Sequence, residues 1–279
     1  MSKELFDKVS IKCSKLTTRA YSTSFSLGIR CLESEMRDPI YAIYGFVRFA
    51  DEIVDTFHDH NKQELLKRFK EDTHQAIHDG ISLNPILHSF QLTVNAFKFE
   101  QELIDQFLKS MEMDLALTVY DQKGIEEYIL GSAEVVGLMC LRVFCKGNER
   151  MYQHLKPSAM KLGSAFQKIN FLRDLNADFH GMGRSYFPGI DLTNFTEESK
   201  KLIEDDIAKD FKAGYEGIKQ LPRSARFGVY VAYLYYIALF EKIKNTPCHV
   251  VLKSRIRVRN RRKISILAYS FLKHQLNLL

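Results

Sequence analysis

The chain has 279 residues, 46% of them hydrophobic, and this excludes an intrinsically disordered protein because a sizeable apolar core can form. Its 14 glycines and 6 prolines are too few for a collagen-like, linker-rich or many-stranded β protein. The formal net charge of +6 suits anionic substrates or a membrane surface, and an ordinary solvated surface explains it equally well.

The predicted elements are helices, because apolar residues recur at three- and four-residue intervals along most of the chain. In chain order they cover Ile40–Asp55, Glu64–Ala76, Asn84–Phe97, Gln101–Val119, Ile125–Phe144, Pro157–Phe179, Glu197–Gln220, Ser224–Lys244 and Ile264–Leu279. We expect Asp38 and Pro39 to begin the first of these, and Asp79 with Gly80 to close the second. No strand hairpin, linker or domain boundary is evident, so the sequence predicts one all-α domain over residues 1–279.

The cysteines and the apolar segments bear on location. The 5 cysteines are odd in number, scattered and without metal-ligand spacing, which indicates reduced thiols in a cytosolic protein. The first residues lack an apolar signal region, and the most apolar window, Phe227–Phe240, is shorter than the roughly 20 residues that span a bilayer. We therefore expect a cytoplasmic protein with no transmembrane segment, and peripheral contact with the inner membrane is compatible with this expectation.

Two predicted helices each carry a polar stripe between apolar neighbours. The first stripe holds Tyr44, Arg48, Asp51 and Asp55, and the second holds Gln167, Asn170, Asp174 and Asp178 with Arg173 beside it. A solvated helix face is the alternative for either stripe alone, but two such stripes suggest four carboxylates around one cavity. Divalent cations with oxygen ligands would relieve their repulsion, which indicates a carboxylate–Mg²⁺–diphosphate site with Arg48, Arg173 and Arg184 as further phosphate donors.

These stripes and three further segments resemble the squalene/phytoene synthase family, the head-to-head trans-prenyl transferases, and most of all the bacterial phytoene synthases. The matching segments are Tyr21–Phe25, Tyr41–Asp55, Tyr128–Gly137, Gln167–Asp178 and Arg184–Pro188. In order, the resemblance runs from about residue 13 to residue 263. It implies a single-domain helical bundle of the isoprenoid-synthase type around a deep central cavity, which agrees with the helices predicted from periodicity.

The resemblance also implies roles for individual residues. The implied catalytic residues are Tyr44, Arg48, Asp51, Asp55, Asp174 and Asp178, and the four aspartates would bind metal with help from Asn170. The implied substrate contacts are Ser22, Ser24, Arg48, Tyr128, Ala133, Val136, Gly137, Gln167, Asn170, Arg173, Arg184, Tyr236 and Arg261. Of these, Tyr236 and Arg261 lie where the match needs a small insertion.

The implied reaction joins two geranylgeranyl diphosphates head to head into phytoene through a cyclopropyl diphosphate. It needs Mg²⁺, which Mn²⁺ could replace, and it ends by proton loss, so NADPH is not expected. An alternative is a squalene or dehydrosqualene synthase acting on two farnesyl diphosphates. An alternative of another class is a non-catalytic relative that serves as an assembly factor, although all four motif aspartates are retained. A head-to-tail prenyl diphosphate synthase is disfavoured because Asp51–Asp55 lacks the paired aspartates of that class.

Two features leave alternatives open. Glu134 stands where the family usually has glycine, and it either reshapes the tail cavity, places another acid near it, or faces solvent. The basic stretch Lys253–Lys263 either steers diphosphate or anionic lipid, or forms a solvated loop and helix start. Because no aromatic residues are interleaved with these cations, nucleic acid is not an expected partner. We expect a monomer or a weak dimer.

Overall fold

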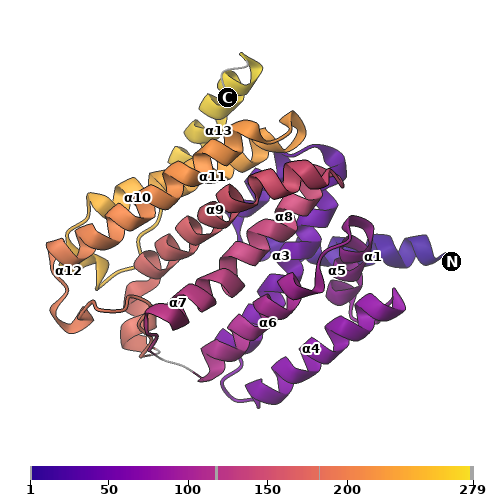
Figure 1. Cartoon of the computed structure of the whole chain (residues 1–279), viewed down its shortest axis with the longest axis horizontal. Coiled ribbons are helices and arrows are strands. Elements are labelled where there is room, and N and C mark those ends of the chain that lie inside the picture. The colour runs from indigo at the N-terminus through magenta and orange to yellow at the C-terminus, as the bar shows by residue number, and fades with distance from the viewer. Residues whose placement is uncertain (1, 117–118, 182, 277–279) are drawn as a thin grey trace.

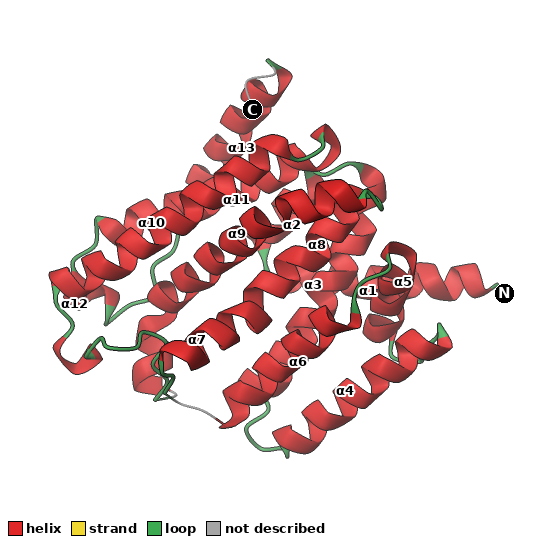
Figure 2. Ribbon diagram, viewed as in Figure 1, coloured by secondary structure: helices red, strands yellow, loops and turns green. Residues whose placement is uncertain are grey.

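The computed structural model describes residues 2–116, 119–181 and 183–276, and it is built from helices (Figures 1 and 2). The α-helices are α1 (Lys3–Tyr21), α2 (Thr23–Arg30), α3 (Ser34–Asp55), α4 (Lys62–Asp79), α5 (Pro85–Phe97), α6 (Gln101–Ala116), α7 (Gln122–Ile129), α8 (Val135–Cys145), α9 (Glu149–Asn176), α10 (Glu197–Gln220), α11 (Arg223–Lys244), α12 (Cys248–Val251) and α13 (Asn260–Gln275). Two π-helical segments, Leu130–Glu134 and Ala177–Gly181, and a short 3₁₀ turn at Leu192–Asn194 complete the described elements. The predicted all-α fold is confirmed.

Local signals explain several helix boundaries. The Asn61 side chain accepts a hydrogen bond from the backbone N–H of Glu64 and so caps α4, which ends at Gly80 in the left-handed conformation with φ 68°. Asn84 caps α5 in the same way, and Pro85 occupies its first turn, where no N–H is needed. The predicted end of α4 at Asp79 and Gly80, the predicted start of α5 at Asn84 and the predicted bounds of α10 are confirmed, whereas α4 begins two residues before the predicted Glu64.

Two predicted helix starts are wrong, and both involve proline. The third helix begins at Ser34, so Asp38 is not its N-cap and Pro39 lies inside it. The ninth begins after Asn148, whose side chain accepts from Met151 N at 3.0 Å, and it runs through Pro157. A proline inside a helix removes one backbone hydrogen bond, and here the packing of these long helices against their neighbours outweighs that loss.

The short helix α12 and both helices at the N-terminal end were not predicted, and two other helices differ from the prediction at one end. The N-terminal helices α1 and α2 were not predicted, and α13 begins four residues earlier than expected, at Asn260. The predicted helix Gln101–Val119 ends at Ala116, and residues 117–118 lie outside the described part, as do residues 277–279 of the last predicted helix.

Residues Gln122–Cys145 form one continuous apolar helix made of α7, a π-helical segment and α8. By length and composition alone it could cross a membrane, but 56% of its most apolar window is buried inside the fold, as in the core helix of a globular bundle. The sequence analysis had placed the most apolar window elsewhere, at 227–240. The π-helical turn brings Gly131 so close to α6 that an added Cβ would lie 2.5 Å from the carbonyl oxygen of Gln106.

A stack of aromatic rings joins α3 to α4, α5 and α6 in the core. Phe46 is fully buried and its ring lies parallel to that of Phe90, with 3.9 Å between centroids. Phe69 and Phe107 contact the same ring from other sides. This packing fixes the axial position of α3, and with it the acidic stripe that α3 carries.

We expect Phe46→Ala to lower the free energy of unfolding by about 3–5 kcal/mol, because it removes a fully buried ring and leaves a cavity. Urea denaturation followed by circular dichroism measures this. The matched control is Phe49→Ala on the same helix, where the side chain is 38% exposed and the loss should be about 1 kcal/mol or less. Equal losses in the two variants would contradict the assignment of Phe46 to the core.

Candidate active site

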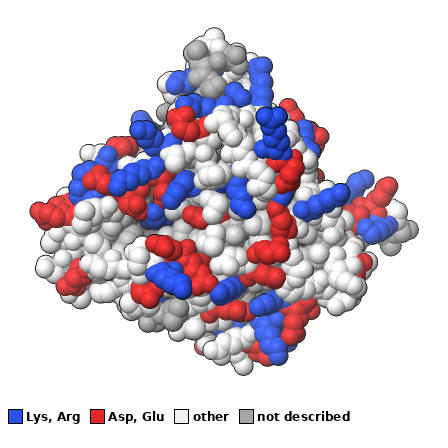
Figure 3. Space-filling view, in the orientation of Figure 1, with Lys and Arg blue, Asp and Glu red and all other residues white. Residues whose placement is uncertain are grey.

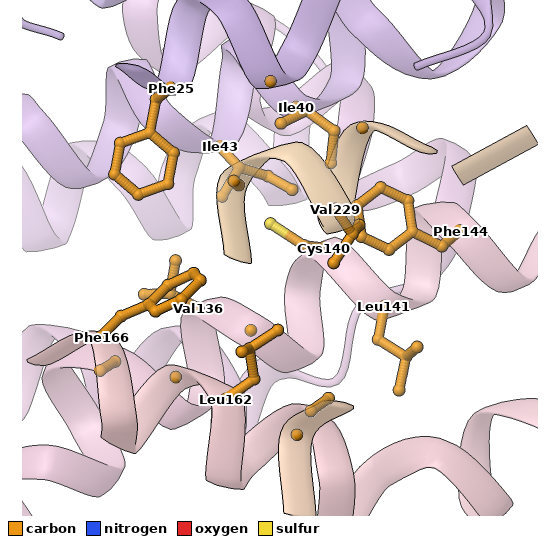
Figure 4. A pocket seen from close by; sticks show the side chains of 18 of the residues that line it. Phe25, Ile40, Ile43, Val136, Cys140, Leu141, Phe144, Leu162, Phe166 and Val229 are labelled. Carbon is orange, nitrogen blue, oxygen red and sulfur yellow. The ribbon is translucent and has the colours of Figure 1, made fainter. Parts of the chain in front are cut away.

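An apolar cavity of about 320 Å³ lies between α2, α3, α8, α9, α10 and α11 (Figure 4). Its walls are aliphatic and aromatic, with Phe25, Ile43, Val136 and Phe166 among the side chains that border it. The predicted site residues that line it are Tyr44, Ala133, Val136, Gly137, Gln167, Asn170 and Tyr236. An apolar pocket with a few polar side chains in its lining, here Tyr44, Gln167, Asn170 and Tyr236, is a usual form of a small-molecule site.

The two predicted stripes approach each other at Asp55 and Asp178, whose carboxylates interact electrostatically, although none of the four aspartates is among the described residues that line the cavity. Burial and the charge of Asp55 raise the pKa of Asp51 well above its ordinary value. Burial and the charge of Asp174 raise the pKa of Asp178 to about 7, and Asp55 on the opposite helix adds to this shift. The charge of Asp55 on α3 therefore raises the pKa of Asp178, which follows α9. This agrees with the hypothesis that the two polar stripes lie close together.

Arginines pair with these carboxylates. The Arg48 guanidinium contacts both Asp51 and Glu52, and it lies over the Tyr21 ring at 4.3 Å from the centroid. Arg173 Nε donates to Asp174 Oδ1 at 3.1 Å. Guanidinium groups bind phosphate oxygens as well as carboxylate oxygens, so these arginines have the chemistry to bind an anionic ligand at this position.

Arg184 links the first aspartate pair to a buried carboxylate that the sequence analysis missed. It donates to Asp55 Oδ1 at 3.1 Å and to the backbone carbonyl of Asp114 at 3.0 Å. Burial raises the pKa of Asp114 to about 6. A signal was present in the sequence, since Asp114 is a lone acid within an otherwise apolar stripe of α6.

Three tyrosines surround the Asp114 carboxylate. Tyr128 donates to Oδ2 at 2.6 Å and Tyr120 to Oδ1 at 3.1 Å, and the Tyr186 hydroxyl lies 3.4 Å from Oδ1. The rings of Tyr120 and Tyr128 each stack on that of Tyr186, and they are tilted relative to one another. Tyr128 was predicted as a substrate contact, and the structure places its hydroxyl on Asp114 beside the aspartate cluster.

Aromatic rings mark the boundary between the polar and apolar parts of the cavity. Tyr236 stacks on Phe166 with 3.9 Å between ring centroids, and its hydroxyl lies 3.4 Å from Asn170 Oδ1. Burial raises the pKa of Tyr44 to about 12, and Ser22 hydrogen bonds with its hydroxyl. Both tyrosines therefore remain neutral hydrogen-bond donors at any physiological pH.

The basic stretch reaches the aspartates through a residue that was not predicted. Arg255 Nε contacts Asp174 Oδ1 at 2.8 Å, so this arginine joins the second aspartate pair. Arg261 lies exposed in the first turn of α13, and no ion pair among the described residues includes it. Alternating arginines point to different sides of an extended segment, so the sequence alone did not show which one reaches the site. The roles of Arg261 and of the half-buried Ser24 remain predictions.

Glu134 does not lie among the described residues that line the cavity, although Ala133 and Gly137 do. It is half-buried near Lys161, Lys168 and Asp210, and burial raises the pKa of its carboxyl. Lys168 Nζ contacts Asp210 Oδ2 at 2.6 Å between α9 and α10. Glu134 therefore belongs to this polar cluster behind the cavity wall.

The donor set fits Mg²⁺ in its chemistry. The five predicted ligands offer only oxygen donors that a hard cation prefers, and their repulsion is what a divalent cation would relieve. Within the described residues, no three His, Cys, Asp or Glu side chains gather tightly enough to enclose a metal ion. Such openness is expected where water and substrate oxygens complete the coordination of Mg²⁺.

Residues 18–262 match the squalene/phytoene synthase family, and the chain belongs to this family of head-to-head prenyl transferases.

Named relatives are similar at low identity. The 4,4'-diapophytoene synthase of Staphylococcus haemolyticus is 27% identical over 68% of this chain and 66% of its own length, so the match spans about two thirds of that enzyme. A presqualene diphosphate synthase of Sinorhizobium fredii is 31% identical over 67% of this chain and 66% of its own. The phytoene synthase of Arthrospira platensis is 26% identical over 85% and 84%. A crystal structure of a dehydrosqualene synthase superposes with a TM-score of 0.84 at 21% identity, covering 96% of this chain and 98% of that one.

Asp178→Asn should stabilise the metal-free protein at neutral pH. The raised pKa means that the folded state holds this proton up to about pH 7, whereas the unfolded state releases it near 3.8. Protonation of Asp178 therefore contributes its full stabilisation of the folded state below pH 3.8, and this stabilisation is lost as the pH rises to about 7. The variant carries no such charge, so its gain in stability over the wild type grows from about pH 4 to about pH 7 and levels off above that.

We expect the gain in unfolding free energy of Asp178→Asn to reach about 1 kcal/mol. This is less than the pKa shift of Asp178 implies, because solvent reaches part of its side chain. Thermal unfolding in EDTA at several pH values measures it. Asp72→Asn, at an exposed position on α4, is the control and should give no pH-dependent gain. A loss of stability in Asp178→Asn at pH 8 would contradict repulsion within the cluster.

Proposed function

We propose that this protein condenses two geranylgeranyl diphosphates head to head into phytoene, the first step of carotenoid synthesis. The observation that carries the proposal is a carboxylate and arginine cluster on α3 and α9, the two helices that also contribute Tyr44, Gln167 and Asn170 to an apolar cavity of about 320 Å³. The choice of geranylgeranyl diphosphate as substrate is supported by the similarity to a phytoene synthase over 85% of the chain. The matches to the 4,4'-diapophytoene synthase and the presqualene diphosphate synthase cover a smaller share of the chain.

The polar end of the cavity suits departure of diphosphate. Mg²⁺ held by Asp51, Asp55, Asn170, Asp174 and Asp178 would supply Lewis-acid neutralisation of the leaving oxygens. Arg48, Arg173 and Arg255 then donate to diphosphate oxygens in place of the carboxylates that they contact without substrate. The neutral Tyr44 hydroxyl adds a donor at the edge of the hydrocarbon cavity.

The apolar end suits the carbon chemistry. Loss of diphosphate from one substrate leaves an allylic cation, and the double bond of the second attacks it with loss of a proton to form the cyclopropyl diphosphate. The second diphosphate then leaves, the skeleton rearranges, and another proton is lost, so that no reductant is consumed and NADPH is not needed. The stacked rings of Phe166 and Tyr236 exclude water and can stabilise a passing cation by roughly 0.5–2 kcal/mol each.

The second candidate uses the same site with two farnesyl diphosphates to make dehydrosqualene or squalene. It is favoured by the superposition on a dehydrosqualene synthase over 96% of the chain. Squalene, unlike dehydrosqualene, would require hydride from NADPH to end the reaction. For either candidate we propose a cytoplasmic monomer or weak dimer with Mg²⁺, or Mn²⁺ in its place, and peripheral membrane contact.

A product assay separates these candidates. We expect purified protein with Mg²⁺ and geranylgeranyl diphosphate to form phytoene without NADPH, at a rate at least tenfold above that with farnesyl diphosphate. Extraction and chromatography of the hydrocarbons, with and without NADPH, provide the measurement. Turnover of farnesyl diphosphate alone would favour the second candidate, and no hydrocarbon from either substrate would favour a non-catalytic assembly factor.

Asp51→Ala and Asp174→Ala should each lower turnover by at least about a thousandfold, since each removes a proposed metal ligand from one of the two aspartate pairs. Circular dichroism would show whether the fold is retained, and Asp72→Ala on the exposed face of α4 should keep full activity. Unchanged turnover in either active-site variant would show that the carboxylates have been assigned wrongly.

A further inference from the structure

The C-terminal part of the chain carries an excess of positive charge. Seven of the eleven residues from Lys253 to Lys263 are Lys or Arg, Lys273 follows them, and no acidic residue comes after Glu241. Since the whole chain has a net charge of only +6, the remaining residues are together net negative. In Figure 3 basic side chains surround the apex of the molecule, where α13 projects in Figure 1.

The helix α13 is held in place by its inner face. The Phe227 ring of α11 stacks on His274 of α13 with 4.7 Å between centroids, and the Ser270 side chain of α13 is fully buried. At the other end, Lys263 Nζ donates to Thr23 Oγ1 at 3.3 Å and ties the start of α13 to α2. These contacts fix which residues of α13 face outward.

Five large apolar residues in or directly after α13 are exposed. Ile264, Tyr269, Phe271, Leu272 and Leu276 have between 48% and 67% of their surface exposed, and we call them the α13 outer face, although the Phe271 ring also contacts that of Phe227 on α11. Single exposed apolar residues are ordinary, but five of them within residues 264–276 mark a surface that binds a partner. The basic stretch lies directly before these residues, and its Arg261 and Arg262 are exposed in the first turn of the helix.

We propose that the α13 outer face, together with the cations that precede it, docks this protein on an anionic lipid bilayer. A helix with exposed apolar side chains and flanking Lys and Arg lies in the membrane interface, with its apolar residues among the acyl chains and its cations at the headgroups. A second copy of the chain fits less well. Two-fold pairing of this face would bring two basic segments together without an acidic residue to offset them.

The position of α13 connects this surface to the active-site cavity. It packs against α11, and Val229, Ala232 and Tyr236 of α11 line the cavity. A bilayer at the α13 outer face would therefore lie on the outer side of a cavity wall. If the proposed function holds, substrate and product are long-chain lipids that the membrane stores, and docking shortens their path. The docking surface itself does not depend on that function.

Vesicle sedimentation tests the proposal with the full chain. We expect binding to vesicles of phosphatidylcholine with 30% phosphatidylglycerol, at least tenfold weaker binding to pure phosphatidylcholine, and weakening by 0.5 M NaCl. Ile264→Glu combined with Leu272→Glu should lower the affinity at least tenfold. Arg262→Gln should lower it about fivefold. Leu202→Glu on α10, which is equally exposed at 67%, is the matched control and should bind like the wild type.

Two further readouts keep the outcome decisive. Turnover in detergent micelles should be the same for Ile264→Glu/Leu272→Glu and the wild type, so a failed synthase assay and a failed docking assay can be told apart. Light scattering gives the oligomeric state of both. The proposal would be overturned by equal binding to neutral and anionic vesicles, or by unchanged binding of the double variant. It would also be overturned if the wild type were a dimer that the double substitution dissociates.

Discussion

Carboxylates gathered at the end of an apolar cavity repel one another more strongly than they would in water, and the site is arranged around that repulsion. Asp51 and Asp178 approach from different helices, and each has its pKa raised by burial and by a neighbouring aspartate. The protein keeps these charges although they cost stability. Such a cost is typical of a functional site, where the balance is restored by a cation or a ligand.

The arginines hold this arrangement together in the absence of substrate. Arg48, Arg173 and Arg255 each contact an aspartate that is proposed to bind metal, and Arg184 bridges Asp55 and the backbone of Asp114. Every one of these pairs can separate and reform around a diphosphate and its cations, since the same donors bind phosphate oxygens. The three tyrosines on Asp114 form a second, more deeply buried layer that fixes the position of this carboxylate.

Residues that share one helix were the easiest to predict. The spacing of Asp51 and Asp55 on α3, and of Gln167, Asn170 and Asp174 on α9, follows from 3.6 residues per turn, so the stripes could be read without coordinates. Residues brought to the site from distant segments were missed. Asp114 and Arg255 lie in α6 and in the loop before α13, and nothing local to either shows that it points toward the aspartates.

The sequence by itself determined the helical class of the fold, the end of α4 at Gly80, the start of α5 at Asn84, and the two acidic stripes, because each depends on interactions within a few residues. Only the tertiary structure decided that α3 and α9 face each other across an apolar cavity, that helices continue through Pro39 and Pro157, and which arginine of the basic stretch reaches Asp174. These outcomes depend on packing between helices that are far apart in the chain. The residue pattern of one helix does not show which other helix packs against it.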